Sequence, residues 1–214
     1  IFNRFQLAGY RTIQTFQGFV YHMTCRGSRF KDGAMRNPAG QVFMKGRESS
    51  EWLAQNLKST RNFIRKWGHM VQHDAYLKPI VPPKYDIAFK ALNCNKQMLY
   101  ELEPWCSKIY LDSGSVGKYS SQYQNEEQLN TQFDLDEKIK MYGYADVTKN
   151  HDILVEFDCT KLNNENFQIL VNLSKMLQDS GEVGEMEFDI FKFYINSLQT
   201  YEDKLIVCKT NLYL

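Results

Sequence analysis

The chain has 214 residues, of which 43% are hydrophobic and 14% aromatic, so it can bury a core and is not disordered throughout. Its net charge is only +1, but residues 1–80 hold 13 Lys and Arg against 4 Asp and Glu, a balance of +9, and residues 81–214 hold 13 against 21, a balance of −8. The longest apolar runs fall far short of the roughly 20 residues that a membrane-spanning helix needs, so we expect no transmembrane segment.

The N-terminal region is rich in arginine and poor in acids. Every arginine lies at or before Arg65, and the first 31 residues contain no Asp or Glu. The chain begins at Ile1 rather than at Met, so we expect that an upstream segment was removed. An arginine-rich, acid-poor stretch is typical of the region around a cleaved organelle-targeting peptide, although a truncated chain would look the same. We therefore expect a mitochondrial protein, in the matrix or peripheral to the inner membrane.

Residues 1–48 are expected to form an extended, irregular basic arm. Glycines interrupt every regular pattern in this stretch, and aromatic side chains such as Phe2, Phe5 and Phe16 need a surface to cover them. Two arrangements satisfy both facts. The arm lies across a neighbouring subunit, or it packs on its own C-terminal body.

Residues 49–77 are expected to form one long amphipathic helix, with Ser49 as its N-cap. Apolar or small side chains recur with helical spacing along one face, at Leu53, Leu57, Thr60, Ile64, Trp67 and Val71. A basic ridge follows another face, at Arg61, Arg65, His69 and His73. Residues 78–84, KPIVPPK, then end the helix and form a stiff Pro-rich connector.

The basic ridge is either a solvated helix face or a surface that meets anions, such as RNA phosphate, acidic lipid head groups or an acidic protein surface. The candidate residues for contacting a partner or an anion are Arg4, Arg11, Arg26, Arg29, Lys58, Arg61, Arg65 and Lys66. We expect the apolar stripe of the helix to pack on the body and the basic ridge to meet the partner.

Residues 85–214 are expected to form a small α+β body, joined by the connector to the long helix and the arm. Helices are predicted over residues 85–93 and 96–103, from Ser121, from Asp134, from Asn163 or Asn164 to near Gly181, and over residues 185–199. Strands are predicted over residues 107–111, 151–157 and 204–214.

Two pairs of residues have the spacing of metal ligands. His22 and Cys25 form an HxxC pair, and His69 and His73 form an HxxxH pair on the predicted helix. Together they would provide the four ligands of a tetrahedral zinc site. The helical pair lacks the Glu of an HExxH metalloprotease motif, so the alternative to having no cofactor is a structural zinc and not a hydrolytic one.

No stretch carries a catalytic signature. The loop at residues 114–118, GSVGK, lacks the spacing of a phosphate-binding P-loop, and no GxSxG nucleophile elbow occurs. The five cysteines form no CxxC pair, which is typical of reduced thiols inside cells. We therefore do not expect an enzyme.

Three classes of function remain. The first is a non-catalytic accessory subunit of a large mitochondrial inner-membrane energy-transducing complex, either respiratory chain or ATP synthase, docked through its basic N-terminal third. The second is a mitochondrial ribosomal protein whose arm binds rRNA, driven by counterion release from phosphate, although the acidic body opposes this. The third is a stand-alone soluble enzyme or binding module.

Overall fold

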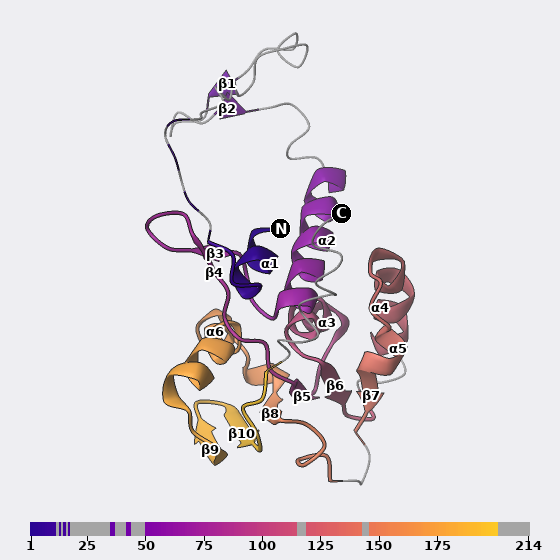
Figure 1. The fold of residues 1–214 in the computed structure, drawn as a ribbon. Coiled ribbons are helices and arrows are strands. Elements are labelled where there is room, and N and C mark those ends of the chain that lie inside the picture. The colour runs from indigo at the N-terminus through magenta and orange to yellow at the C-terminus, as the bar shows by residue number, and fades with distance from the viewer. Residues whose placement is uncertain are drawn as a thin grey trace.

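The computed structural model describes residues 1–11, 13, 15, 17, 35–36, 42–43, 50–114, 119–142 and 146–200. Its body is a mixed α+β fold that contains a six-stranded sheet and several helices (Figure 1). The fold class predicted for the body is therefore confirmed.

The sheet combines parallel and antiparallel pairing. In the described residues its strands are β5 (Ile87–Leu92), β6 (Lys108–Leu111), β7 (Ile139–Met141), β8 (Ile153–Asp158), β9 (Gly184–Phe188) and β10 (Phe191–Ile195), in the order β7-β6-β5-β8-β10-β9. Strands β7, β6, β5 and β8 run parallel to one another, and the hairpin of β9 and β10 joins antiparallel to β8. The chain thus builds outward from β5 in one direction and later returns to place β8 on the other side of β5.

The helices of the body are α3 (Lys96–Leu102), α4 (Tyr119–Glu127), α5 (Leu135–Lys138) and α6 (Asn164–Ser180), with short 3-10 turns at Glu103–Trp105, Gln128–Asn130 and Cys159–Lys161. Before the body come α1 (Phe2–Leu7), the strand pair β1 (Met35–Arg36) and β2 (Val42–Phe43), the long helix α2 (Ser50–Trp67), and the strand pair β3 (Gln72–His73) and β4 (Pro79–Ile80).

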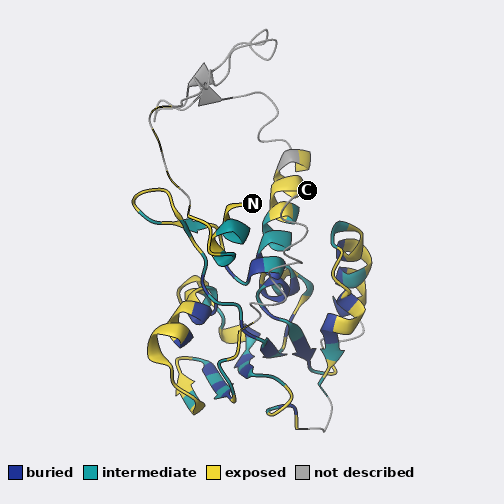
Figure 2. Cartoon of the chain, in the orientation of Figure 1, coloured by how far each residue is buried: buried dark blue, intermediate teal, exposed yellow. Residues whose placement is uncertain are grey.

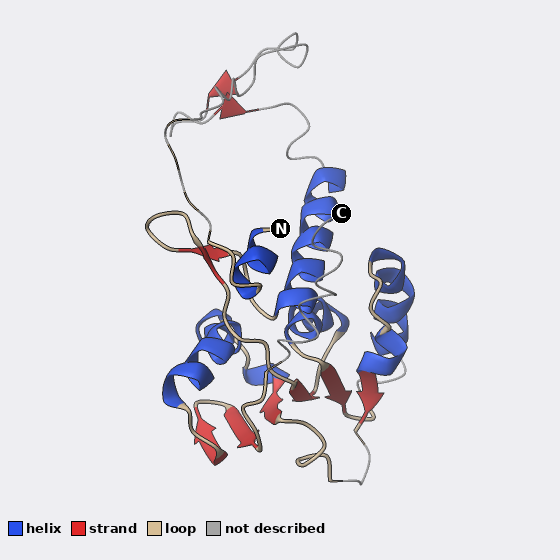
Figure 3. Ribbon diagram, in the orientation of Figure 1, coloured by secondary structure: helices blue, strands red, loops and turns tan. Residues whose placement is uncertain are grey.

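The body has one thick core and one thin one. Alternate residues of β5 point to opposite faces, so Ile87, Phe89 and Ala91 face the core shared with α3 and α6. On the opposite face, Ala88 joins a smaller cluster under the loop that contains Val147. Figure 3 shows the same asymmetry, with α3, α4 and α6 on one side of the sheet and a loop crossing the other.

Several predicted elements are confirmed together with their capping residues. Helix α6 begins after Asn163, whose side-chain oxygen accepts the backbone N–H groups of Glu165 and Asn166, and ends at Gly181 with a left-handed φ of 65°. Helix α5 begins after Asp134, whose carboxylate accepts the N–H of Glu137. Helix α3 and strands β6 and β8 also lie where the sequence predicts them.

Two predicted helices are wrong. Residues 85–93 contain β5, whose continuous apolar run is buried on both faces of a parallel sheet and therefore lacks the alternation of a half-exposed strand. Residues 185–199 contain most of β9 and all of β10, where Phe191, Phe193 and Ile195 alternate inward. The turn between these strands places Asp189 at a φ of 55°. The helical spacing of apolar residues in this stretch is incidental.

Helix α2 is shorter than predicted, ending at Trp67 and not at Leu77. Gly68 adopts a left-handed φ of 77°, which a helix interior does not allow. The Lys84 ammonium then donates to the carbonyl oxygens of Arg65 at 2.6 Å and Lys66 at 3.3 Å, which satisfies the end of the helix. Residues beyond Gly68 turn back as β3 and β4 instead of continuing the helix.

Replacing Gly68 by alanine is expected to destabilise the fold by about 1–2 kcal/mol through left-handed strain. A Cβ at this position would also lie only 3.1 Å from the Lys84 Cγ, so the loss should exceed that of the control Gly181→Ala, where no atom lies within 4 Å of the added Cβ. Urea unfolding of both variants measures the difference. A Gly68→Ala variant as stable as the parent would contradict this account of the helix end.

The N-terminal predictions are tested only in part. Within the predicted arm, Phe2–Leu7 is helical. In the predicted connector, β4 pairs with β3, so its first residues belong to a small hairpin. Most of the arm, the predicted N-cap Ser49 and the predicted strand 204–214 lie outside the described residues.

Candidate functional site

The two arginines of the basic ridge, Arg61 and Arg65, lie on α2 and face the body. Among the residues that the structure describes, Arg65 is the largest of the fully buried side chains. Its guanidinium lies 2.7 Å from a carboxylate oxygen of Glu103 and 2.8 Å from one of Glu127. Arg61 completes the arrangement with a bidentate pair to Glu127, at 2.7 Å for both contacts. The ridge that was expected to meet a partner therefore joins α2 to α4 and to the end of α3.

Two further side chains close this buried network. The Tyr123 hydroxyl donates to Glu103 at 2.7 Å, and the Lys138 ammonium lies 2.5 Å from the other oxygen of the same carboxylate. Burial alone would raise the pKa of Glu103, but Lys138 and Arg65 outweigh it and hold the pKa below its usual value. Burial likewise opposes ionisation of Glu127, and the hydrogen bonds from Arg61 and Arg65 lower its pKa. Both carboxylates are therefore ionised at neutral pH, and each has hydrogen-bond partners.

The other predicted contact residues lie in different places. Lys58, Lys66 and Arg4 are half-buried, and Arg11 is exposed. Arg26 and Arg29 lie outside the described residues. The structure thus separates the predicted set: two arginines are used inside the fold, and four basic side chains remain at its surface.

The predicted helical metal pair does not form. Because α2 ends at Trp67, His69 lies in the following turn and His73 in β3, so they do not share a helix face. His69 is buried, its Nδ1 lies 2.5 Å from the Met70 carbonyl oxygen, and burial lowers its pKa. His22 and Cys25 lie outside the described residues. Among the residues that the structure describes, no group of three or more His, Cys, Asp or Glu side chains could hold a metal ion.

The apolar stripe of α2 leaves the core halfway along the helix. Ile64 and Trp67, near the base, are buried, whereas Leu57 is 59% exposed and Leu53 is 48% exposed. Figure 2 shows this change along α2, from buried residues at its base to exposed residues in its outer turns. The outer turns of α2 therefore present apolar side chains that the body does not cover.

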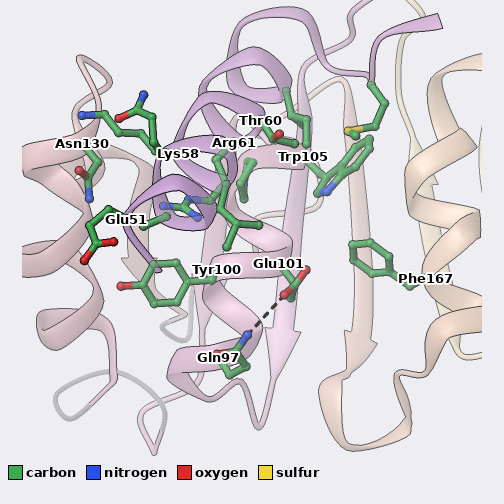
Figure 4. A pocket seen from close by; sticks show the side chains of 16 residues that line it. Glu51, Lys58, Thr60, Arg61, Gln97, Tyr100, Glu101, Trp105, Asn130 and Phe167 are labelled. Atoms are coloured by element: carbon green, nitrogen blue, oxygen red, sulfur yellow. Dashed lines mark hydrogen bonds between the residues drawn. The ribbon is translucent and has the colours of Figure 1, made fainter. Parts of the chain in front are cut away.

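A groove of about 600 Å³ lies beside these outer turns. Its α2 wall includes Ala54, Leu57 and Ile64. Aromatic side chains from other elements also line it (Figure 4). These aromatic residues are Tyr100 of α3, Trp105 of the following 3-10 turn and Phe167 of α6. An apolar groove of this size with aromatic walls is the kind of surface that receives another protein segment.

The sequence does not predict the groove, because the residues that line it come from distant parts of the chain. Trp105 and Phe167 lie 62 residues apart, and their rings meet edge to face at 6.3 Å only in the folded body. Glu103 and Glu127 of the buried network are equally unmarked by local pattern, because they lie 38 and 62 residues from Arg65 along the chain.

A second polar chain lies at the amino-terminal edge of the parallel strands. The Tyr110 hydroxyl is 2.9 Å from His151 Nε2, and His151 Nδ1 is 3.1 Å from an Asp86 carboxylate oxygen. This resembles the nucleophile, base and orienting acid of a catalytic triad. However, burial and the charge of Asp86 raise the pKa of Tyr110, so its phenol stays protonated. These hydrogen bonds connect the start of β5, strand β6 and the loop before β8.

The described cysteines lie inside the core. Cys94, Cys106 and Cys159 are buried free thiols. Burial raises the pKa of Cys106 to about 12, and a hydrogen bond with Cys159 followed by burial raises that of Cys94. Cys94 and Cys106 therefore resist ionisation and are poor nucleophiles. All three cysteines belong to the hydrophobic core.

None of the helices within the described residues is both long and apolar enough to cross a bilayer. The assignment of a function rests on this chain's own geometry, because comparison with protein-family models, curated proteins and solved structures gives no match.

Proposed function

We propose that the protein is a non-catalytic accessory subunit of a large mitochondrial inner-membrane energy-transducing complex, of the respiratory chain or of ATP synthase. The observation that supports this most is the apolar stripe of α2, which continues beyond the core to the exposed Leu57 and Leu53 beside an aromatic groove. A subunit that fills a space between larger partners needs such a surface, and it needs no catalytic centre.

The groove has the composition of an interface centre. Large aromatic side chains supply most of the binding energy at protein interfaces, and Tyr100, Trp105 and Phe167 provide them here. Leu57 lines the same groove, so a partner segment would bury apolar surface against it as well as against the aromatic side chains. We infer that the occupant is an apolar segment of another subunit, since the two charge signs of Glu51 and Lys58 at the groove leave no strong bias for a charged one.

The buried network supports the same role by fixing α2. Arg65 bridges two carboxylates from different parts of the body, so the angle at which α2 projects is set before any partner arrives. A rigid, pre-positioned helix loses less conformational entropy on binding than a mobile one. The basic contacts proposed for the N-terminal third then rest on Arg4, Arg11, Lys58 and Lys66, together with Arg26 and Arg29 outside the described residues, and no longer on Arg61 and Arg65.

The mitochondrial location rests on the sequence of the arm, with its arginines and its lack of acids in the first 31 residues. The assembly is proposed to be a protein complex rather than a ribosome because residues 81–214 carry a balance of −8, which repels RNA phosphate.

Native electrophoresis of mitochondrial extract tests the proposal. The full chain is expected to migrate with a large assembly that forms in mild detergent and survives ribonuclease. Release of the chain by ribonuclease would favour the ribosomal alternative. Migration as a free monomer, with nothing copurifying, would instead favour a stand-alone enzyme or binding module and would overturn the proposal.

A further inference from the structure

A second pocket, of about 460 Å³, lies on α2 beside the loop that follows α4. Its α2 wall is formed by Lys58, Asn62 and Lys66, and residues 129–133 form the other wall. Lys58 and Asn130 also border the aromatic groove, but the remaining residues are distinct. Of the described side chains that line this pocket, two are basic and none is acidic.

The loop wall is held in place by hydrogen bonds. The Asn62 amide donates to the Asn130 carbonyl oxygen at 2.8 Å, and the Gln128 amide donates to that of Phe133 at 2.9 Å. Gln128 also accepts the backbone N–H of Leu135 at 2.9 Å. Leu129, which is 87% exposed, and Phe133, which is 38% exposed, are therefore held at the rim by a fixed backbone.

The basic side chains of the pocket are not neutralised. In the part of the chain that the structure describes, neither Lys58 nor Lys66 forms an ion pair. Burial, and then the charge of Arg4, lower the pKa of Lys66, so its ammonium lies close enough to another cation to feel repulsion. An anion placed at the pocket would relieve this repulsion.

Three acidic side chains that are close in sequence to the loop wall have partners of their own. Glu127 is held by Arg61 and Arg65 in the buried network. The Asp134 carboxylate caps the N–H of Glu137 at 3.0 Å, and the Glu137 carboxylate lies 3.2 Å from the Lys140 ammonium. The charged side chains that line the pocket itself are Lys58 and Lys66.

We propose that this pocket binds the phosphate head group of an anionic phospholipid, with Leu129 and Phe133 entering the membrane interface beside it. Lysine binds phosphate as a point charge, and the neutral amide and hydroxyl groups of Asn62, Thr131 and Gln132 offer further donors. Exposed apolar side chains next to basic ones are the pattern of a surface that lies on an anionic bilayer. The proposal rests on the membrane-peripheral location in the proposed function.

Co-sedimentation of the full chain with vesicles tests this. Binding is expected to vesicles that contain phosphatidylglycerol in phosphatidylcholine, to be absent with phosphatidylcholine alone, and to weaken as salt is raised. Lys58→Ala and Lys66→Ala should each lower the partition coefficient about fivefold, and the double variant about 30-fold. Leu129→Asn should lower it further, whereas the control Lys175→Ala on α6 should leave it unchanged.

Two results would overturn the inference. One is vesicle binding that is absent or that does not change in the double lysine variant. The other is saturable binding of soluble glycerol phosphate without binding to vesicles, which would assign the pocket to a free phosphate compound. Either result leaves native electrophoresis with the large assembly unaffected, so the subunit role and the lipid site fail separately.

Discussion

Replacement of Arg65 by methionine is expected to lower the free energy of unfolding by about 3–5 kcal/mol. Methionine fills the space but leaves the buried carboxylates of Glu103 and Glu127 without their shared partner. Lys138 and Arg61 still contact one carboxylate each, which keeps the loss from being larger. Urea unfolding at neutral pH measures the change, and α2 should lose its fixed position against the body.

Two control variants separate the effect of burial from the effect of charge on the free energy of unfolding. Lys96→Met removes a solvent-exposed ion pair with Glu126 and should leave the free energy of unfolding nearly unchanged. Arg65→Lys keeps the charge but cannot bridge two carboxylates with a planar fork, so its loss should lie between those of the other variants. An Arg65→Met variant as stable as Lys96→Met would show that the network does not hold α2 in place.

The difference between the parent and Arg65→Met is also expected to depend on pH. In the parent the folded-state pKa values of Glu103 and Glu127 lie below their usual values, so the stability they contribute is present above about pH 4.3 and is lost as pH falls through the folded pKa values. In the variant each carboxylate has lost one of its two cationic partners, so protonation at low pH reduces the cost of burying its charge. The gap in unfolding free energy should therefore narrow on acidification, and a gap that widens would contradict the assigned charges.

The double substitution Leu53→Glu and Leu57→Glu is expected to weaken incorporation into the assembly at least about 30-fold, the effect of losing an interface residue worth about 2 kcal/mol. Both side chains are largely exposed in the free chain, so the free energy of unfolding should change by no more than about 0.5 kcal/mol. The assembly is first depleted of this chain. The concentration of unlabelled variant that is needed to displace labelled parent chain from this assembly then measures the loss of affinity.

Met176→Glu provides the matched control. Met176 lies on α6 and is 44% exposed, so the control adds one of the two negative charges of the leucine variant at an apolar surface position that does not line the groove. It should compete as well as the parent chain. If the leucine variant also competes like the parent, the groove is not the docking surface.

The sequence predicts those elements whose ends are fixed by local chemistry. Asn163 and Gly181 bracket α6 because an N-cap oxygen and a left-handed glycine act over a single turn. Asp134 marks α5 in the same way. The charge asymmetry does not show that the arginines of α2 pair with acids of the same chain, because it fits a solvated helix face or an external partner equally well.

The elements that local pattern misses depend on distant contacts. Strand β5 is buried between β6 and β8, and its apolar run is ambiguous until both neighbours are known. The orientation of α2 depends on Glu103 and Glu127, whose position relative to Arg65 follows from the packing of α3 and α4. Hydrophobic periodicity alone assigns the apolar stripe to the body and the basic ridge to a partner. The buried ion pairs reverse the role of the ridge.

Site-specific photocrosslinking in the native assembly tests the docking role of α2 most directly. A photoreactive benzoylphenylalanine is placed at Leu57, in the groove wall, and in a separate chain at Met176 on α6. The account predicts that position 57 crosslinks to one partner subunit with high yield and that position 176 does not crosslink to it. Full incorporation of both chains with no crosslink from position 57 would contradict it.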